Sequence, residues 1–352
     1  DRTHFIFELL QNAEDALARR SNWRGPMAVQ FVLTKDLLRF THFGKPFDEA
    51  DVRGICGIAE GTKDLTAIGR FGIGFKSVYA FTSRPEIHSG TEDFVIENFV
   101  WPAAVPSLAR DRDETIILIP LKGSDKTGHE EIVGGLERLA ASALLFLRHI
   151  QEIRWSVTGG KSGLYQRKER KISQGVRRVA VVSKEAGKPE VENIWQVFSR
   201  PVGVRGGRQV GHVEIAFSLA SGETPRRKSV QRVERSPLVV FFPTVLETYL
   251  GFLVQGPYRT TPSRDNVPRS DAWNQRLVRQ TAGLVVEALS WFRDARALDA
   301  EVLQCLPLDG AKFDEGSMFA PVFETTKRAL KTKALLPRYG NGYVAARHAK
   351  LA

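Results

Sequence analysis

FELLQNAEDAL at residues 7–17 and GRFGIGFKSVYA at residues 69–80 carry most of the information in this chain. In the first stretch Glu8, Asn12 and Asp15 recur at helical spacing, so their polar groups project from one face of a helix whose other positions are largely apolar. A carboxylate and an amide one turn apart suit a base and a metal ligand. The second stretch is a glycine-rich turn leading into a helix-compatible segment, where backbone N–H groups can hold phosphate. Together they predict the two ends of one pocket for a phosphate-bearing ligand.

The composition indicates a globular chain of two or three domains. It has 352 residues, of which 42% are hydrophobic and 26% are charged, and no apolar run approaches the ~18 residues that span a bilayer. We therefore expect no membrane contact. Cys56 and Cys305 provide neither a disulfide framework nor metal-ligand spacing, so we expect a cytoplasmic protein. Residue 1 falls at a helical pattern without an initiator methionine, and we expect further domains beyond this sequence.

The chain is strongly basic, with a formal net charge of +11 that comes partly from clusters at residues 167–171 and 226–235. Such a surface fits nucleic acid, an anionic protein or an acidic domain outside this sequence. An ordinary solvated basic face is the alternative.

Hydrophobic periodicity divides the chain into three predicted domains, 1–155, 156–297 and 298–352. In the first, the pattern predicts an α+β sandwich with a mobile lid at residues 61–68. The second is expected to be α/β, and the third a helical extension with a small hairpin. Strands are predicted at 27–33, 37–41, 92–99, 114–121, 150–158, 177–183, 194–198 and 213–217, and helices at the opening residues, 48–59, 130–148 and 272–295.

Residues 1–120 resemble the GHKL ATPases, and most closely their sacsin-type and heat-shock-ninety-like members. Glu8, Asn12 and Asp15-Ala16 match the N-box of that family. The resemblance implies that Glu8 orients or deprotonates the attacking water and that Asn12 binds Mg²⁺. It also implies a Bergerat-type α/β sandwich, with a mixed and mainly antiparallel sheet and helices on one face, followed by a transducer-like domain.

The glycine-rich turn matches the phosphate-binding box of the same family. Glycines lack a Cβ, which lets the backbone approach phosphate, and the interleaved apolar residues are expected to anchor the turn. A dinucleotide-binding fold can also contain such a turn, but the N-box upstream favours the GHKL assignment. For the lysine, an exposed helix position is an alternative to phosphate contact. The residues assigned to this segment are Gly69, Phe71, Gly72, Ile73, Gly74, Phe75 and Lys76.

Further matches concern the lid and the residues that contact adenine. Lys63 lies in a Gly-Thr-Lys segment that resembles the chaperone lid, and it is expected to reach nucleotide phosphate when the lid closes. Thr115 resembles the threonine that touches adenine through its hydroxyl and a water. Where most of the family has Asp-x-Gly, this chain has His42-Phe43-Gly44. A neutral imidazole nitrogen can accept one hydrogen bond from the adenine amine, so we retain ATP as the ligand and leave base selectivity open.

Ser263-Arg264-Asp265 resembles the Ser-Arg-Glu element of the chaperone middle domain, in which the arginine reaches the terminal phosphate of ATP. The fixed charge and planar fork of Arg264 suit that role. A salt bridge within the turn is the alternative.

The leading functional hypothesis is a Mg²⁺-dependent ATPase that switches its lid and second domain between two states, as chaperones and MutL-like proteins do, and that pairs as a homodimer when ATP is bound. The alternative is a nucleotide-gated scaffold whose basic second domain binds nucleic acid or a protein client with little hydrolysis. Glu8 argues against a pure scaffold, which needs no general base. A histidine kinase is disfavoured because those enzymes lack the water-activating glutamate.

Overall fold

A computed structural model describes residues 2–57, 74–122, 126–139, 141–205, 208–220, 229–261 and 266–349. The chain forms two compact units, Asp1–Lys168 with Val181–Glu192, and Glu169–Ala180 with Asn193–Ala352. The boundary predicted at residue 155 falls inside a strand of the first unit, and residues 298–352 belong to the second unit. Among the described residues, no helix combines the length and apolar character needed to cross a bilayer.

The first unit is an α+β layer structure, as predicted. Its strands follow the order β9-β8-β7-β1-β2-β6-β3-β4-β5. The pair β1 and β7 is parallel, whereas β2 pairs antiparallel with both β1 and β6. The sheet is therefore mixed and mainly antiparallel. The strand bounds are Ala28–Leu33 (β1), Leu37–Phe43 (β2), Glu86–Ser89 (β3), Glu92–Glu97 (β4), Trp101–Ala104 (β5), Glu114–Pro120 (β6), Glu152–Val157 (β7), Ser162–Ser173 (β8) and Val176–Glu185 (β9); the last two continue into the second unit.

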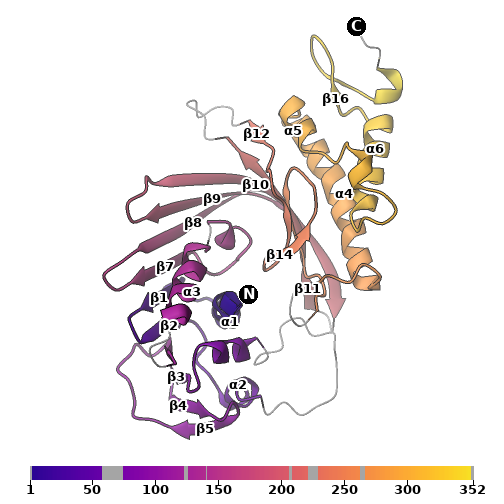
Figure 1. Cartoon of the computed structure of the whole chain (residues 1–352). Coiled ribbons are helices and arrows are strands. Elements are labelled where there is room, and N and C mark those ends of the chain that lie inside the picture. The colour runs from indigo at the N-terminus through magenta and orange to yellow at the C-terminus, as the bar shows by residue number, and fades with distance from the viewer. Residues whose placement is uncertain are drawn as a thin grey trace. The chain divides into compact units, whose positions relative to one another are not determined.

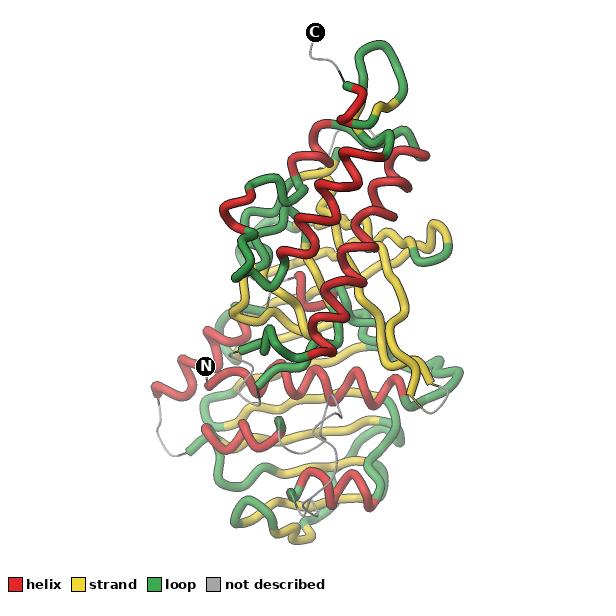
Figure 2. The backbone as a smooth tube through the Cα atoms, turned by 90° about the vertical axis from the view of Figure 1, so that its right-hand side faces the viewer, coloured by secondary structure: helices red, strands yellow, loops and turns green. Residues whose placement is uncertain are grey.

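The helices of the first unit lie on one face of these strands (Figures 1 and 2). They cover a row of buried rings and aliphatic side chains, in which Phe31 and Phe40 are in contact at 4.6 Å between ring centroids. Phe5, on the opening helix, packs against Phe81 at 5.2 Å. The helices are η1 (Arg2–His4), α1 (Phe5–Ala18), α2 (Glu49–Ile55), η2 (Phe75–Ala80), α3 (Lys126–Glu137) and η3 (Ala141–Leu144).

The helix predicted at 130–148 is wrong in its length. Helix α3 ends at Glu137, and a 3-10 turn and a loop follow. At the far end of the predicted range a tertiary contact excludes a helix, because the backbone N–H groups of Arg148 and Ile150 donate to the buried carboxylate of Glu14 at 2.7 and 2.9 Å. A continued helix would direct those N–H groups to carbonyls four residues earlier. The turn after the glycine box is also a 3-10 helix, η2, rather than an α-helix.

In the second unit one long helix, α4, packs on a sheet, and α6 packs on α4. Its strand order is β14-β13-β15-β11-β10, with β12 beside β11, and β13 and β15 run parallel. Helix α4 contacts both β11 and α6 (Figure 1). The core includes a cluster of rings in which Phe217 lies 5.2 Å from Phe292. The elements are β10 (Val191–Arg205), β11 (Arg208–Leu219), β12 (Val230–Gln231), β13 (Pro237–Val240), β14 (Phe242–Glu247), β15 (Leu253–Gln255), α4 (Ala272–Asp294), α5 (Ala300–Gln304), η4 (Gly310–Lys312), α6 (Ala320–Thr332), β16 (Leu336–Pro337), β17 (Tyr343–Val344) and η5 (Ala346–His348); the first residues of β10 belong to the first unit.

Candidate nucleotide site

Helix α1 carries the polar stripe that the sequence predicts. Glu8, Asn12 and Asp15 are partly buried, while most other side chains between Phe5 and Leu17 are fully buried. The helix contacts β2 and η2, which bring the segments around residues 42 and 74 to it. The stripe is therefore held at fixed positions on a rigid element.

The carboxylate of Glu8 lies directly against the last glycine of the glycine box. A Cβ added at Gly74 would lie 1.8 Å from Glu8 Oε2, so no side chain fits there unless the carboxylate moves. The φ of Gly74 is −66°, which any residue adopts, and the glycine is therefore required by the approach of Glu8 rather than by backbone conformation. The imidazole Nε2 of His4, one helical turn away, lies 3.6 Å from Glu8 Oε1. Glu8 thus contacts the end of the glycine-rich turn.

Gly44 directly follows strand β2 and packs against the backbone of helix α1. Its φ is +138°, and an added Cβ would lie 2.6 Å from the carbonyl carbon of Ala16. The N–H of Lys45 donates to the Ala16 carbonyl at 3.0 Å. Ala16 and Gly44, two predicted site residues from separate motifs, are therefore in direct backbone contact.

We expect Gly44→Ala to destabilise the folded chain by about 1–3 kcal/mol, because the added methyl group meets the α1 backbone and a positive φ disfavours alanine. Urea denaturation at neutral pH measures the change in the free energy of unfolding. Gly187→Ala is the matched control, since Gly187 also has a positive φ, +76°, but a Cβ there meets nothing within 4 Å. Equal losses in the two variants would show that the contact with α1 adds nothing.

The base-reading residues predicted from the sequence lie side by side on neighbouring strands. His42 on β2 is the register partner of Thr115 on β6, and Thr115 is in turn the partner of Ser89 on β3. The hydroxyls of Ser89 and Thr115 are 2.5 Å apart, and Ser89 Oγ accepts from the N–H of Phe47 at 3.0 Å. Ser89 was not predicted, because a serine near the end of a short strand carries no sequence signal of its own. It positions the Thr115 hydroxyl.

His42 is buried and neutral. Burial lowers its pKa to about 4, and the charge of Arg19 acts in the same direction. Its Nδ1 lies 3.4 Å from the carbonyl oxygen of Phe43, which favours the tautomer with the proton on Nδ1. Its Nε2 has no hydrogen-bond partner among the described residues. A buried acceptor without a donor is what the exocyclic amine of adenine would satisfy, so this residue fits the base.

The adjacent carboxyl groups of Glu14 and Asp15 on α1 have pKa values shifted in opposite directions. Glu14, only 5% exposed, accepts hydrogen bonds from the backbone N–H groups of residues 148–150 and from the His149 ring. Burial by itself raises the pKa of Glu14, but these donors outweigh it and hold the pKa below its ordinary value. Burial and the neighbouring Glu14 charge raise the pKa of Asp15 to about 6. The pKa of Asp15 therefore lies nearer neutral pH than that of an ordinary aspartate.

Glu14 was missed by the sequence reasoning, although a signal existed. It lies at helical spacing from Leu10 and Leu17, which are both buried, and a carboxylate at such a position must find donors. Its partners at residues 148–150 are far away in sequence, and only the fold identifies them. The role of Glu14 is to fasten that loop to α1.

Lys76 does not extend freely from the glycine turn. A Cβ at Gly57 would lie 2.2 Å from Lys76 Nζ, which places the ammonium group at the end of helix α2. Phe75 is buried, as expected of an anchor. The predicted lid at 61–68 lies outside the described residues, and so do the assigned residues Lys63, Gly69, Phe71, Gly72, Ile73 and Arg264.

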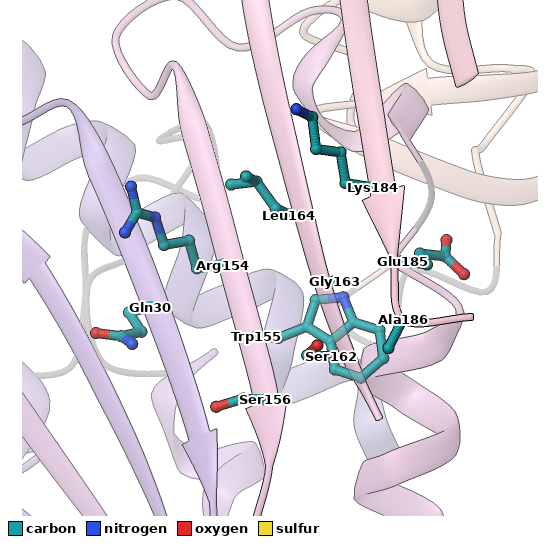
Figure 3. Close-up of a pocket in the computed structure, with 10 residues that line it drawn as sticks. All are labelled: Gln30, Arg154, Trp155, Ser156, Ser162, Gly163, Leu164, Lys184, Glu185 and Ala186. Carbon is teal, nitrogen blue, oxygen red and sulfur yellow. The ribbon is translucent and has the colours of Figure 1, made fainter. Parts of the chain in front are cut away.

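A separate hollow of about 570 Å³ lies on strands β1, β7, β8 and β9, and none of the predicted site residues lines it (Figure 3). Trp155 and Gly163, which face each other in the pairing of β7 and β8, form part of its wall. A Cβ at Gly163 would lie 2.2 Å from the indole nitrogen of Trp155, so the glycine makes room for the ring. Its charged lining residues are Arg154, Lys184 and Glu185.

Comparison with known proteins gives one family match and one curated relative. Residues 40–99 match the model of the sacsin domain, a segment that includes His42, Gly44 and the glycine box. Protein NO VEIN of Arabidopsis thaliana is 30% identical over 320 residues, which are 82% of this chain and 11% of that protein. The chain thus spans about a tenth of the length of this relative.

Solved structures with a similar fold include ATPase domains. The ATPase domain of the mismatch repair endonuclease MutL from Aquifex aeolicus is 10% identical, covers 80% of this chain and 94% of its own, and has a TM-score of 0.32. The B-subunit of DNA gyrase from Myxococcus xanthus is 10% identical, covers 82% and 89%, and has a TM-score of 0.38. The match of residues 40–99 to the sacsin domain confirms the sacsin-type resemblance that the sequence predicts for this part of the chain.

Proposed function

We propose that this chain binds ATP with Mg²⁺ and hydrolyses it. The observation that carries the proposal is the contact between Glu8 and Gly74, because it places a carboxylate of α1 against the turn whose sequence is that of a phosphate-binding loop. A general base must be within hydrogen-bond reach of the water that attacks the terminal phosphate. A carboxylate packed on the phosphate-binding turn meets that requirement.

Several of the described site residues have a definite role in this proposal. The amide oxygen of Asn12, one turn after Glu8, would hold Mg²⁺, which supplies charge neutralisation at the phosphates when bound. Nε2 of His42 would accept a hydrogen bond from the adenine amine, and the Thr115 hydroxyl, positioned by Ser89, would complete the polar edge of the base site. Gly44 keeps this edge in contact with α1. In this proposal the base-binding end and the phosphate-binding end of the site therefore both lie against helix α1.

The consequence of hydrolysis is proposed as a conformational switch. In this proposal the lid at 61–68 closes over the nucleotide, and Lys63 and Arg264 contact the phosphates in the closed state. Pairing of two chains in the ATP state belongs to the same proposal.

The first test is calorimetric titration with a non-hydrolysable ATP analogue, with Mg²⁺ and with EDTA. We expect saturable binding that weakens by roughly tenfold or more without Mg²⁺, because a metal bridge to the phosphates is lost. Asn12→Ala is expected to bind as weakly with Mg²⁺ as the wild type does without it. Gln30→Ala, an exposed amide on β1, is the control and is expected to bind normally. No heat in the wild type, together with no displacement of a fluorescent analogue, would refute the proposal.

A further inference from the structure

A groove in the second unit lies between α6, the loop after α5 and η5. It encloses about 700 Å³. Its apolar surface comes from Pro307, Leu308, Phe323 and Leu330, and Leu308 is 58% exposed. An aliphatic side chain this exposed at the edge of a hollow is available for contact with another molecule.

Helix α6 presents two different faces. Val322, Thr326 and Ala329 are buried, and the helix packs on α4. Phe323 and Leu330 lie on the adjoining face, which lines the groove. Since the first face is fixed in the core, the groove wall is held rigidly.

The rim of the groove is cationic. Lys327, Lys331 and Arg347 line it, and no Asp or Glu does. None of the three forms an ion pair with a described residue. Asp309, the carboxylate nearest in sequence to Leu308, caps the N–H of Ala311. From residue 325 to 349 the sequence has no Asp or Glu, and its Lys and Arg residues are Lys327, Arg328, Lys331, Lys333, Arg338 and Arg347.

We propose that this groove binds an acidic amphipathic peptide segment of a partner protein. Apolar side chains of the segment would fill the space between Leu308 and Leu330, and its carboxylates would pair with Lys327, Lys331 and Arg347. The carboxylates of such a segment complement the basic rim, and its apolar side chains complement the aliphatic lining. The inference goes beyond nucleotide binding and does not depend on it.

The aromatic content of the groove favours a peptide over nucleic acid. Single-stranded nucleic acid is held largely by bases stacked on open aromatic faces. The one aromatic ring in the groove lining, Phe323, already stacks on Phe313, with 5.8 Å between the centroids and 3° between the planes. The Lys327 ammonium lies over the same ring at 5.3 Å from its centroid. The accessible apolar surface is therefore aliphatic, which suits leucine-like side chains.

The test is fluorescence anisotropy with the whole chain and a labelled short peptide that has leucine pairs at helical spacing and Asp or Glu elsewhere. We expect saturable binding that weakens as salt rises. The double variant Lys327→Glu with Lys331→Glu should bind at least about tenfold more weakly, since attraction becomes repulsion. Arg328→Glu is the matched control, because Arg328 is on the same helix but does not line the groove, and it should change affinity less than about threefold.

The apolar half of the proposal has its own controls. Leu308→Ser should weaken binding by roughly tenfold, whereas Val245→Ser, at an apolar position 76% exposed outside the groove, should leave it unchanged. A second peptide with serine in place of each leucine should not bind. Equal losses in Lys327→Glu/Lys331→Glu and Arg328→Glu would overturn the proposal, as would no binding of the first peptide or its displacement by a single-stranded oligonucleotide of equal charge. These readouts need no ATP, so their failure is distinct from failure of the proposed ATPase activity.

Discussion

Glu8→Gln should abolish most ATP hydrolysis while leaving nucleotide binding nearly unchanged. A positioned general base contributes about 10²- to 10⁴-fold to the rate of such a step, and glutamine cannot take a proton from water. Glutamine has the same shape as glutamate, so the packing against Gly74 is retained and the fold should not change. The measurement is single-turnover hydrolysis of ATP with Mg²⁺, together with the affinity for a non-hydrolysable analogue, for both proteins.

Gly74→Ala tests the role of Glu8 independently. The added methyl group overlaps the carboxylate end of Glu8, which can swing away at small cost, so we expect near-normal stability and lower turnover. Glu49→Gln, at an exposed carboxylate on α2, is the control and should hydrolyse ATP normally. Wild-type turnover in Glu8→Gln would mean that this carboxylate is not the base, even if ATP binds.

The elements that the sequence predicted well are those with strong periodicity. Helix α1 and strands β1, β2 and β6 lie where alternation or helical spacing placed them, because each has one face buried in the same core. Helix α4, predicted at 272–295, was found at Ala272–Asp294 with Asp271 as its N-cap. Local pattern and tertiary burial agree in these segments, so single-sequence reasoning sufficed.

The failures arise where a distant residue overrides the local pattern. The segment after Glu137 has apolar residues at spacings that suit a helix, but the Glu14 carboxylate holds the N–H groups of residues 148–150 in a loop. Ser89 could not be identified because its importance comes only from being opposite Thr115. The sequence proposed candidate site residues, whereas the contacts Glu8–Gly74 and Ala16–Gly44 came from the fold.

Glu14→Gln should be among the most destabilising conservative changes in the first unit, by about 2–4 kcal/mol at neutral pH. The variant keeps the volume but loses the charge that accepts several hydrogen bonds, and its amide N–H₂ would face backbone N–H groups of residues 148–150. Urea denaturation of the two proteins measures the difference in the free energy of unfolding. A loss below about 0.5 kcal/mol would show that this carboxylate does not fasten the loop.

The direction of the pKa shift of Glu14 predicts how the stability deficit of Glu14→Gln varies with pH. Because the folded-state pKa of Glu14 lies below its ordinary 4.5, its stabilisation is fully present above about pH 4.5 and is lost as pH falls through the lower folded-state value. The deficit of Glu14→Gln should therefore shrink in acid and be constant from pH 6 to 8. An unchanged deficit at low pH would mean that lost packing, rather than lost charge, is responsible.

Asp15→Asn, at the neighbouring position, is the matched control and should have the opposite effect. The pKa of Asp15 is raised from 3.8 to about 6, so the folded state binds the extra proton between these values and loses stability as pH rises through them. Replacing this carboxylate should stabilise the chain by roughly 1–2 kcal/mol above pH 7, after allowance for partial exposure, and by nothing near pH 4. The two variants differ by one helix position, yet one removes a carboxylate that the backbone satisfies and the other removes one that it does not. A carboxylate that costs stability on the face it shares with Glu8 and Asn12 would be explained by the nucleotide site that we propose rather than by folding.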